Sequence, residues 1–211
     1  MSEQAPGRAP GRSDIVPCGP GGCSSYEPTK GRETMDFPEL QLLIAGEWRG
    51  RAGHDTLPVV DPATEQVLAE VPIANDADLD AALDAASATF AEWRDTPAAD
   101  RAAILQRAAG LLRERADEIG RIQTLEEGKG LTESISEVVG AADLLQWSAE
   151  EGRRAYGRIV PSRVHGGRSI VLREPLGPVA AFTPWNFPIL IPARKLGAAL
   201  AAGCPVVFKP A

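Results

Sequence analysis

Two short segments near the end of the chain carry residues that could do chemistry on a carbonyl compound. Asn186 lies within residues 183–188, where two prolines fix their own φ angles and restrict the residues before them, so the loop should be stiff. A stiffly held carboxamide can donate a hydrogen bond to an oxyanion on a carbonyl carbon. Lys209, which precedes Pro210, could bind ribose hydroxyls or phosphate through its ammonium group.

Both residues also have a purely structural explanation. Asparagine is a good N-cap, so Asn186 could instead begin the helix that follows it. Lysines are mostly exposed, so Lys209 could be a solvated residue at a strand end. On spacing alone the structural interpretation is favoured for both residues.

The surrounding pattern predicts a strand, a helix and a second strand. Residues 178–182 are an apolar run of the buried-strand type, residues 188–202 are Ala-rich and helical, and residues 205–208 form another buried strand. The segment that connects the two strands is long enough for a crossover, so we expect the strands to be parallel and the crossover to be right-handed. Ligands of such sheets bind beyond the carboxyl ends of the strands, so Asn186 and Lys209 should share one rim of the sheet.

Three hairpins are predicted elsewhere in the chain. The first covers residues 42–48, and the second covers residues 56–71 with a turn at 61–64. The third covers residues 158–173, where several arginines indicate an exposed or edge position.

The first predicted helix begins at an N-cap provided by Asn75 or Asp76. Apolar residues then recur at helical spacing, and such a stripe is typical of a helix that packs on a core. The stripe comprises Leu79, Leu83, Ala86, Phe90 and Trp93. We expect these side chains to be core residues.

A second helical stretch should begin with Thr96 as N-cap and Pro97 as its first helical residue. It is long for one globular helix and should break near residues 115–117. Residues 126–130 lack the spacing of a phosphate-binding loop, so they are predicted to be a helix C-terminus with glycine stops. A further helix should cover residues 131–152.

The composition excludes several classes of protein. The chain has 211 residues, of which 44% are hydrophobic and 24% are charged, as in ordinary soluble globular proteins. Its net charge of −7 is not the basic footprint that nucleic acids or anionic membranes require. Neither an apolar membrane span nor a secretory signal is visible. We therefore expect a cytoplasmic protein without nucleic-acid or membrane partners.

The cysteines and histidines predict neither a disulfide framework nor a metal site. Cys18 and Cys23 lie far from Cys204, the number of cysteines is odd, and no CxxC pair is present. His54 and His165 have no second ligand at metal spacing. Cys204 precedes a buried strand with no adjacent base, so it should be an inert buried thiol.

Residues 1–36 are expected to be a disordered arm. They are rich in glycine and proline and contain almost no aliphatic residues. Such a segment cannot bury enough apolar surface to offset the entropy of ordering it.

From about residue 42 onward, the sequence resembles the aldehyde dehydrogenase superfamily. The resemblance rests on a series of motifs in the family's order, at residues 44–48, 61–64, 124–129, 173–178, 183–188 and 199–211. Members of this family oxidise aldehydes to acids, or in some branches to acyl-CoA, with NAD or NADP. A cysteine thiolate attacks the aldehyde, hydride passes to the nicotinamide, and a glutamate base helps to hydrolyse the thioester. The first two turns depart from the family's usual Gly or Asn-Gly at Ala45 and Glu65.

The resemblance implies roles for individual residues. It makes Asn186 the catalytic oxyanion donor, Lys209 the contact to the adenosine ribose, and Phe187 a lining residue of the aldehyde site. The implied cofactor-binding residues are Phe182, Thr183, Pro184, Trp185, Lys209 and Ala211. Residues 158–176 resemble the strands through which subunits of the family associate.

The implied fold is α/β, the N-terminal part of the aldehyde dehydrogenase fold. Leading hairpins and helices in residues 37–157 belong to the cofactor-binding domain, residues 158–176 form a protruding oligomerisation hairpin, and residues 177–211 begin a Rossmann-like parallel sheet. Residues 1–36 precede these parts as the disordered arm.

The family's nucleophilic cysteine and its base glutamate both lie well beyond the position of Lys209, and none of the three cysteines matches the nucleophile. We therefore expect an N-terminal fragment of an NAD(P)-dependent aldehyde dehydrogenase, inactive by itself, from an enzyme that is a homo-oligomer. Residues 147–161 are most similar to the succinate-semialdehyde branch. The alternative is a truncated, non-catalytic relative that acts through subunit association.

Overall fold

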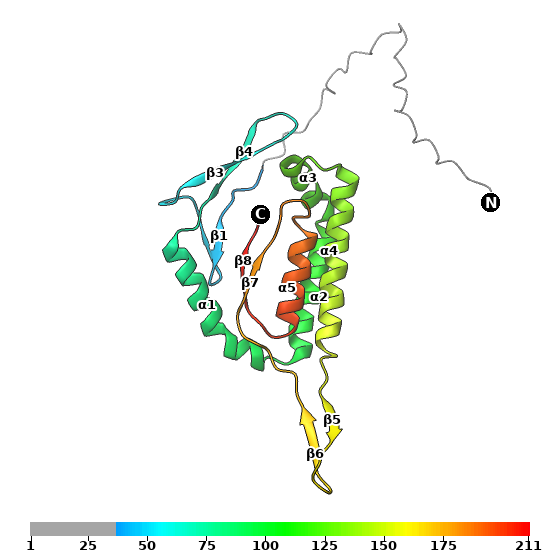
Figure 1. The fold of residues 1–211 in the computed structure, drawn as a ribbon. Helices are drawn as coiled ribbons and strands as arrows, with labels where there is room; N and C mark the ends of the chain where they lie inside the picture. The colour runs from blue at the N-terminus through cyan, green and yellow to red at the C-terminus, as the bar shows by residue number, and fades with distance from the viewer. Residues whose placement is uncertain (1–36) are drawn as a thin grey trace, which may run out of the picture. The chain divides into compact units, whose positions relative to one another are not determined.

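The computed structural model describes residues 37–211 (Figure 1). The predicted arm, with Cys18 and Cys23, lies outside the described residues. The elements in chain order are β1 (Leu42–Ile44), β2 (Glu47–Arg49), β3 (Thr56–Val60), β4 (Val67–Pro72), α1 (Asp76–Asp95), α2 (Ala98–Glu114), α3 (Ala116–Glu127), α4 (Leu131–Gly152), β5 (Arg158–Pro161), β6 (Arg168–Val171), β7 (Val179–Phe182), α5 (Leu190–Ala201) and β8 (Val206–Lys209). The predicted α/β class is confirmed.

The three predicted hairpins form as antiparallel pairs, β1–β2, β3–β4 and β5–β6. The turn between β1 and β2 places Ala45 at φ 53° and Gly46 at φ 80°, as a two-residue turn of the I′ type requires. Glu65, in the turn before β4, also has a positive φ of 59°. The two positions that depart from the family's glycine pattern therefore hold left-handed backbone, which costs a residue with a Cβ about 1 kcal/mol.

Helices α2, α4 and α5 pack around a core that is mostly alanine. Small side chains let the helix backbones approach closely, and Gly197 on α5 extends this contact. A Cβ at Gly197 would lie 2.9 Å from Ser148 Oγ and 3.1 Å from Leu145 Cδ2, both on α4. The buried residues of this core are Ala102, Leu105, Ala109, Ala141, Ala142, Leu145, Ala149, Ala193 and Ala201.

Strands β7 and β8 pair in parallel, with Val179 opposite Val206 and Phe182 opposite Lys209. Helix α5 connects them, so the predicted strand–helix–strand unit is confirmed. Figure 1 shows this pair between α1 on one side and α5 on the other, and the β5–β6 hairpin projecting away from the helices.

Two details of the helix predictions are wrong. The carbonyl of Pro97 accepts hydrogen bonds from Asp100 N and Arg101 N, so Pro97 is the N-cap and α2 begins at Ala98. Thr96 instead closes the preceding helix, because its Oγ1 and its N–H both donate to Glu92 O. The break before α3 at Arg115 and the bounds of α4 are as predicted.

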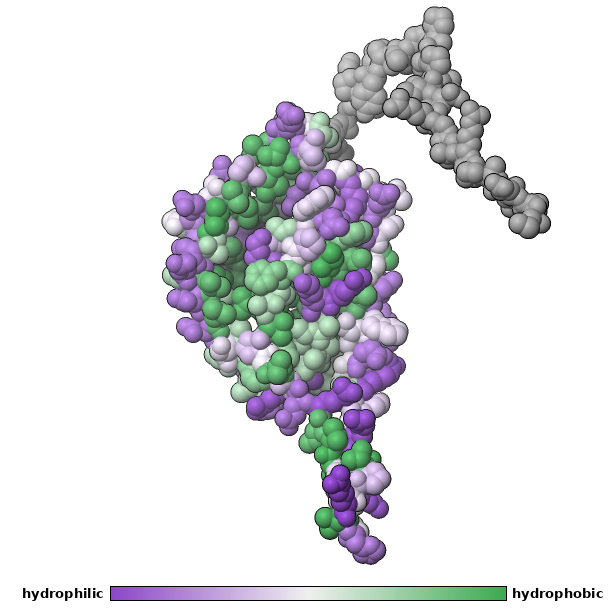
Figure 2. Space-filling view, viewed as in Figure 1, coloured by the Kyte–Doolittle hydropathy of each residue, from purple (hydrophilic) through white to green (hydrophobic). Residues whose placement is uncertain are grey.

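The apolar stripe of α1 is only partly buried. Ala86 is buried, but Leu79 and Leu83 remain 50% and 46% exposed. Figure 2 shows apolar residues gathered between α1 and α5, over the β7–β8 pair. The expectation that the whole stripe is core is therefore wrong for residues 37–211. In the first turn it is Asp78 that is buried, bonded to Arg49 and His54, while Leu79 and Leu83 remain exposed.

Side chains from other helices hold the C-terminal end of α5. The buried guanidinium of Arg101 donates to the carbonyls of Ala201, Arg94 and Thr96. Trp93 Nε1 donates to Leu200 O at 3.1 Å. The last carbonyls of a helix have no partners within it, and a cation near them also interacts favourably with the helix dipole. Arg101 therefore connects the C-terminal ends of α1 and α5 through hydrogen bonds.

Replacing Arg101 should destabilise the fold. Arg101→Met removes the donor from three backbone carbonyls, of which that of Ala201 is in a buried bond, and should lower the free energy of unfolding by about 3 kcal/mol, with Arg101→Lys in between. Urea denaturation of the 211-residue chain measures the loss. As a control, Arg115→Met breaks only an exposed ion pair with Glu118 and should cost less than about 1 kcal/mol. Equal losses in the two variants would show that Arg101 has no such role.

Candidate functional site

The carboxyl ends of β7 and β8 bring the predicted site residues to one edge. Phe182 and Lys209 are direct partners in the parallel register, and Thr183 N donates to Lys209 O at 3.3 Å. The loop at residues 183–188 follows one strand and residues 210–211 follow the other. The predicted juxtaposition of Asn186 and Lys209 on one rim is thus confirmed by the topology.

Most of the predicted site residues are accessible at this edge. The side chains of Phe182, Trp185 and Phe187 are large, apolar and 64%, 71% and 42% exposed. The exposed residues also include Pro184, Asn186, Lys209 and Ala211. Thr183 is the exception, because it is buried and its Oγ1 has no hydrogen-bond partner within residues 37–211. The edge therefore combines apolar surface, a lysine, a carboxamide and one unsatisfied hydroxyl.

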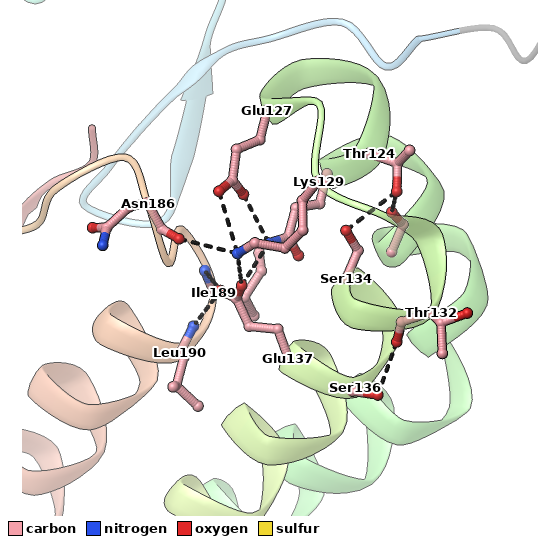
Figure 3. Close-up of polar contacts among 12 residues, drawn as sticks. Thr124, Glu127, Lys129, Thr132, Ser134, Ser136, Glu137, Asn186, Ile189 and Leu190 are labelled. Atoms are coloured by element: carbon pink, nitrogen blue, oxygen red, sulfur yellow. Dashed lines mark hydrogen bonds and ion pairs between the residues drawn. The ribbon is translucent and has the colours of Figure 1, made fainter. Parts of the chain in front are cut away.

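Asn186 does not cap α5, so the structural interpretation of this residue is wrong. The N-cap of α5 is Ile189, and no side chain of the loop caps the helix. Glu137 on α4 does so instead, because its Oε1 accepts from Ile189 N at 3.0 Å and from Leu190 N at 3.1 Å. Figure 3 shows the carboxamide of Asn186 pointing away from these groups, while its backbone oxygen points toward Lys129.

Every N–H in the first turn of α5 is accounted for. Glu137 takes those of Ile189 and Leu190, and Ile191 N donates to Phe187 O. Pro192 has no N–H to satisfy. The first N–H groups of a helix have no partners within the helix. Glu137, which is distant in the sequence, supplies the acceptor that two of them need and so stabilises the junction between the loop and α5.

Lys129 is the centre of a polar network that sequence reasoning missed. Its Nζ donates to Glu137 Oε2 at 2.5 Å and to Asn186 O at 3.0 Å, and it lies 3.2 Å from Glu127 Oε1. The same ammonium group lies 4.4 Å from the centroid of the Phe187 ring, within cation–π range. Lys129 therefore touches the backbone or ring of two predicted site residues (Figure 3).

Local structure explains why Lys129 can reach the loop. Gly128 ends α3 in the left-handed conformation, at φ 80°, and Gly130 is the N-cap of α4. The prediction of a helix C-terminus with glycine stops is confirmed, but Lys129 lies between two helices instead of on one. Glu137 falls on the buried face of α4 with Ser134 and Ala141, and a carboxylate at that helical spacing was the signal available in the sequence.

Hydrogen bonding keeps both members of this pair charged. The Glu137 side chain is only 3% exposed, and burial by itself raises the pKa of a carboxyl group. Hydrogen bonds from Lys129, from the N–H groups of Ile189 and Leu190, and from Gln123 outweigh that effect and hold the pKa of Glu137 below its ordinary value. Burial likewise lowers the pKa of Lys129, but its bonds to Glu137 and Glu127 carry that pKa above the ordinary value.

A cavity of about 230 Å³ opens beside the loop, against α3. Its lining is mainly apolar, with carboxylates at one side. The lining residues are Pro62, Ile119, Ile122, Gln123, Glu126, Glu127, Trp185, Pro188, Ile189 and Ala211. Trp185 and Ala211 therefore share a cavity as well as an edge of the sheet.

No metal site is found in the described part of the chain. Among residues 37–211, no group of three or more His, Cys, Asp or Glu residues is arranged to hold a metal ion. His54 instead lies 2.8 Å from Asp78 through Nε2 and Oδ2. Cys204 is buried as predicted. No helix within the same residues is long and apolar enough to cross a membrane.

The charge of Glu137 should make stability depend on pH. Its pKa in the folded chain lies below the ordinary value of 4.5, so its contribution is complete above pH 4.5 and is lost as the pH falls through the lower folded value. Glu137→Gln lacks that contribution. Urea denaturation from pH 7 to pH 3 should show a stability gap between the two chains that is constant near neutrality and shrinks in acid. A gap that is independent of pH would contradict this role.

A family model matches most of the described part of the chain. Residues 48–211 match the model of the Aldehyde dehydrogenase family. A 4-(hydroxymethyl)benzenesulfonate dehydrogenase of Comamonas testosteroni is 48% identical over 171 residues, which cover 81% of this chain and 36% of that protein. A succinate-semialdehyde dehydrogenase of Escherichia coli strain K12, named for NADP(+), is 43% identical with the same coverage of both chains.

The fold is shared as well. The crystal structure of succinate-semialdehyde dehydrogenase from Burkholderia pseudomallei superposes with a TM-score of 0.79 at 45% identity, over 82% of this chain and 36% of that one. The chain thus spans about a third of the length of each relative, and the matching region is the N-terminal part. The motifs, the match to the family model and the common fold agree. This chain belongs to the aldehyde dehydrogenase family.

Proposed function

We propose that this chain is the N-terminal part of an NAD(P)-dependent enzyme that oxidises an aldehyde to a carboxylate. The observation that carries the proposal is the edge of the β7–β8 pair, where the Asn186 loop and Lys209 lie side by side in a member of this family. A carbonyl-activating group next to a nucleotide-binding group is what hydride abstraction from an aldehyde adduct requires.

Asn186 supplies the oxyanion donor in this proposal. Its carboxamide is exposed, and no hydrogen bond to it is formed by the residues from 37 to 211, so its N–H groups are available to a ligand. When a thiolate adds to the aldehyde, negative charge develops on the carbonyl oxygen. A donor already aimed at that oxygen stabilises the transition state more than the ground state.

The proposed cofactor site uses the remaining residues of the edge. Lys209 offers a point charge for ribose hydroxyls, while Phe182 and Trp185 offer apolar surface for a planar ring. The buried, unsatisfied hydroxyl of Thr183 and the cavity that Trp185 shares with Ala211 fit a bound polar ligand. NAD or NADP bound here would accept the hydride, and the NADP(+) in the name of one relative supports this choice.

The proposed substrate is a small aldehyde of the semialdehyde class. Support comes from relatives named succinate-semialdehyde and glutarate-semialdehyde dehydrogenases, at 43% and 42% identity. Phe187 is exposed beside Asn186 and would line the approach to the carbonyl carbon. We propose succinate semialdehyde as the first compound to assay.

The nucleophile and the base are proposed to lie in the complete enzyme outside these 211 residues. Cys204 is unsuitable because it is buried just before β8, whereas Asn186 and Lys209 lie at the carboxyl end of the sheet. By itself the chain therefore carries the oxyanion donor and part of a cofactor site.

A second candidate function is subunit association without catalysis, and the β5–β6 hairpin favours it. Its cross-strand partners Ile159 and Ile170 are 65% and 68% exposed, and Val164 and Leu172 are exposed to a similar degree. Exposed apolar residues on an open two-stranded ribbon suit pairing with another subunit. In the enzyme proposal the same hairpin holds a homo-oligomer together.

Asn186→Ala in the complete enzyme should lower kcat about 100- to 1,000-fold, because one oxyanion donor is lost, and should leave cofactor affinity unchanged. Steady-state kinetics with succinate semialdehyde and cofactor titrations measure the two effects. Asn75→Ala is the matched control, since Asn75 caps α1 far along the chain from the site and should affect stability alone. Equal activity of the two variants would overturn the role of Asn186.

The 211-residue chain should not reduce NAD or NADP in the presence of succinate semialdehyde, whereas the complete enzyme should. Sequencing the gene beyond codon 211 shows whether the reading frame continues and whether a cysteine nucleophile follows. Turnover by the 211-residue chain that survives Asn186→Ala would contradict the proposed mechanism. A stop codon in the intact gene would favour the association function.

A further inference from the structure

The prolines of the loop do not restrain Asn186 itself. Pro184 fixes its own φ and restricts Thr183, and Pro188 fixes its own φ and restricts Phe187. Asn186 lies between these pairs and precedes no proline. The residue whose direction matters for an oxyanion donor is therefore the one that the local sequence leaves free.

Lys129 restrains the backbone at Asn186 through a hydrogen bond. Its ammonium group donates to the backbone oxygen of Asn186 at 3.0 Å and lies over the ring of Phe187 at 4.4 Å. A peptide group is planar, so holding this carbonyl sets the plane between Asn186 and Phe187. The carboxamide then leaves the backbone on the side away from Lys129, as Figure 3 shows.

Glu137 holds Lys129 and the far side of the loop with one carboxylate. One oxygen accepts from Lys129 at 2.5 Å and from Gln123 at 2.6 Å, and the other accepts from Ile189 N and Leu190 N. The side chains of Lys129 and Glu137 are 15% and 3% exposed, so solvent screens the pair little. The charged pair thus restrains the chain both at Asn186 and three residues later.

We propose that Lys129 and Glu137 are positioning residues for catalysis, which hold the Asn186 carboxamide in its oxyanion-binding direction. This inference rests on the proposed function, since it assigns a role in the same reaction. Neither residue touches the reacting atoms. Misplacing a catalytic group by about 1 Å can cost roughly 100-fold in rate, so the restraint has a measurable consequence.

Kinetics of the complete enzyme test the proposal. Lys129→Met keeps an unbranched side chain without the charge, and Glu137 retains its bonds to Gln123 and to the helix N–H groups. We expect kcat to fall at least about tenfold while cofactor affinity stays the same. Lys129→Arg can still donate to Glu137 and to Asn186 O, so it should recover part of the loss. Arg115→Met is the control for removal of a cation from an exposed ion pair.

A double-mutant cycle separates positioning from general structural support. If Lys129 acts through Asn186, adding Lys129→Met to Asn186→Ala should lower kcat by less than about threefold further, because no carboxamide is left to position. A structural role would multiply the two losses. Full multiplication, or an unchanged kcat in Lys129→Met alone, would overturn the proposal.

Amide hydrogen exchange in the complete enzyme gives a readout that does not need turnover. Peptides covering residues 183–190 should exchange faster in Lys129→Met than in the wild type or in Arg115→Met. Unchanged exchange there would overturn the positioning role even if the enzyme is active. Faster exchange in an enzyme that oxidises no aldehyde would retain the restraint and reject the proposed function instead.

Discussion

The structure of the candidate site depends on a carboxylate buried on one helix and bonded to the first N–H groups of another. Glu137 of α4 accepts from the first N–H groups of α5, and within residues 37–211 no side chain nearer in the sequence does so. A buried carboxylate is costly unless it is paired, and Lys129 provides the opposite charge. Lys129 in turn contacts the loop that precedes α5. One ion pair therefore connects the α3–α4 junction, the loop at residues 183–188 and the helix that follows it.

The other end of α5 is held in a complementary way. There, Arg101 and Trp93 donate to its last carbonyls, so the helix has a carboxylate at its positive end and a guanidinium at its negative end. Gly197 and the alanines around it bring α5 close to α4 between these two anchors. Because α5 connects β7 to β8, its fixed position also determines where the two strands end and hence where the site edge lies.

The chemistry assigned to this edge is consistent with what surrounds it. The residues proposed to face a ligand, such as Asn186 and Trp185, are exposed. Lys129 and Glu137, which bond to the backbone of the same loop and of the helix start, have side chains only 15% and 3% exposed. That division suits the catalytic role proposed for the loop, since a preorganised site requires supporting groups whose own positions are fixed. The β5–β6 hairpin has no comparable support and carries exposed apolar residues, which fits association instead of chemistry.

The sequence by itself determined the order and type of the elements: the hairpins, the break at Arg115 and the parallel strand–helix–strand unit all follow from periodicity and turn residues within a few positions of one another. Only the tertiary structure decided what caps α5, why Leu79 stays exposed, and what holds Asn186. The bond from Lys129 to Asn186 joins residues 57 positions apart, and those from Glu137 to the start of α5 span 52 and 53. Local patterns do not encode which distant donor meets which acceptor, because packing of whole helices sets that geometry.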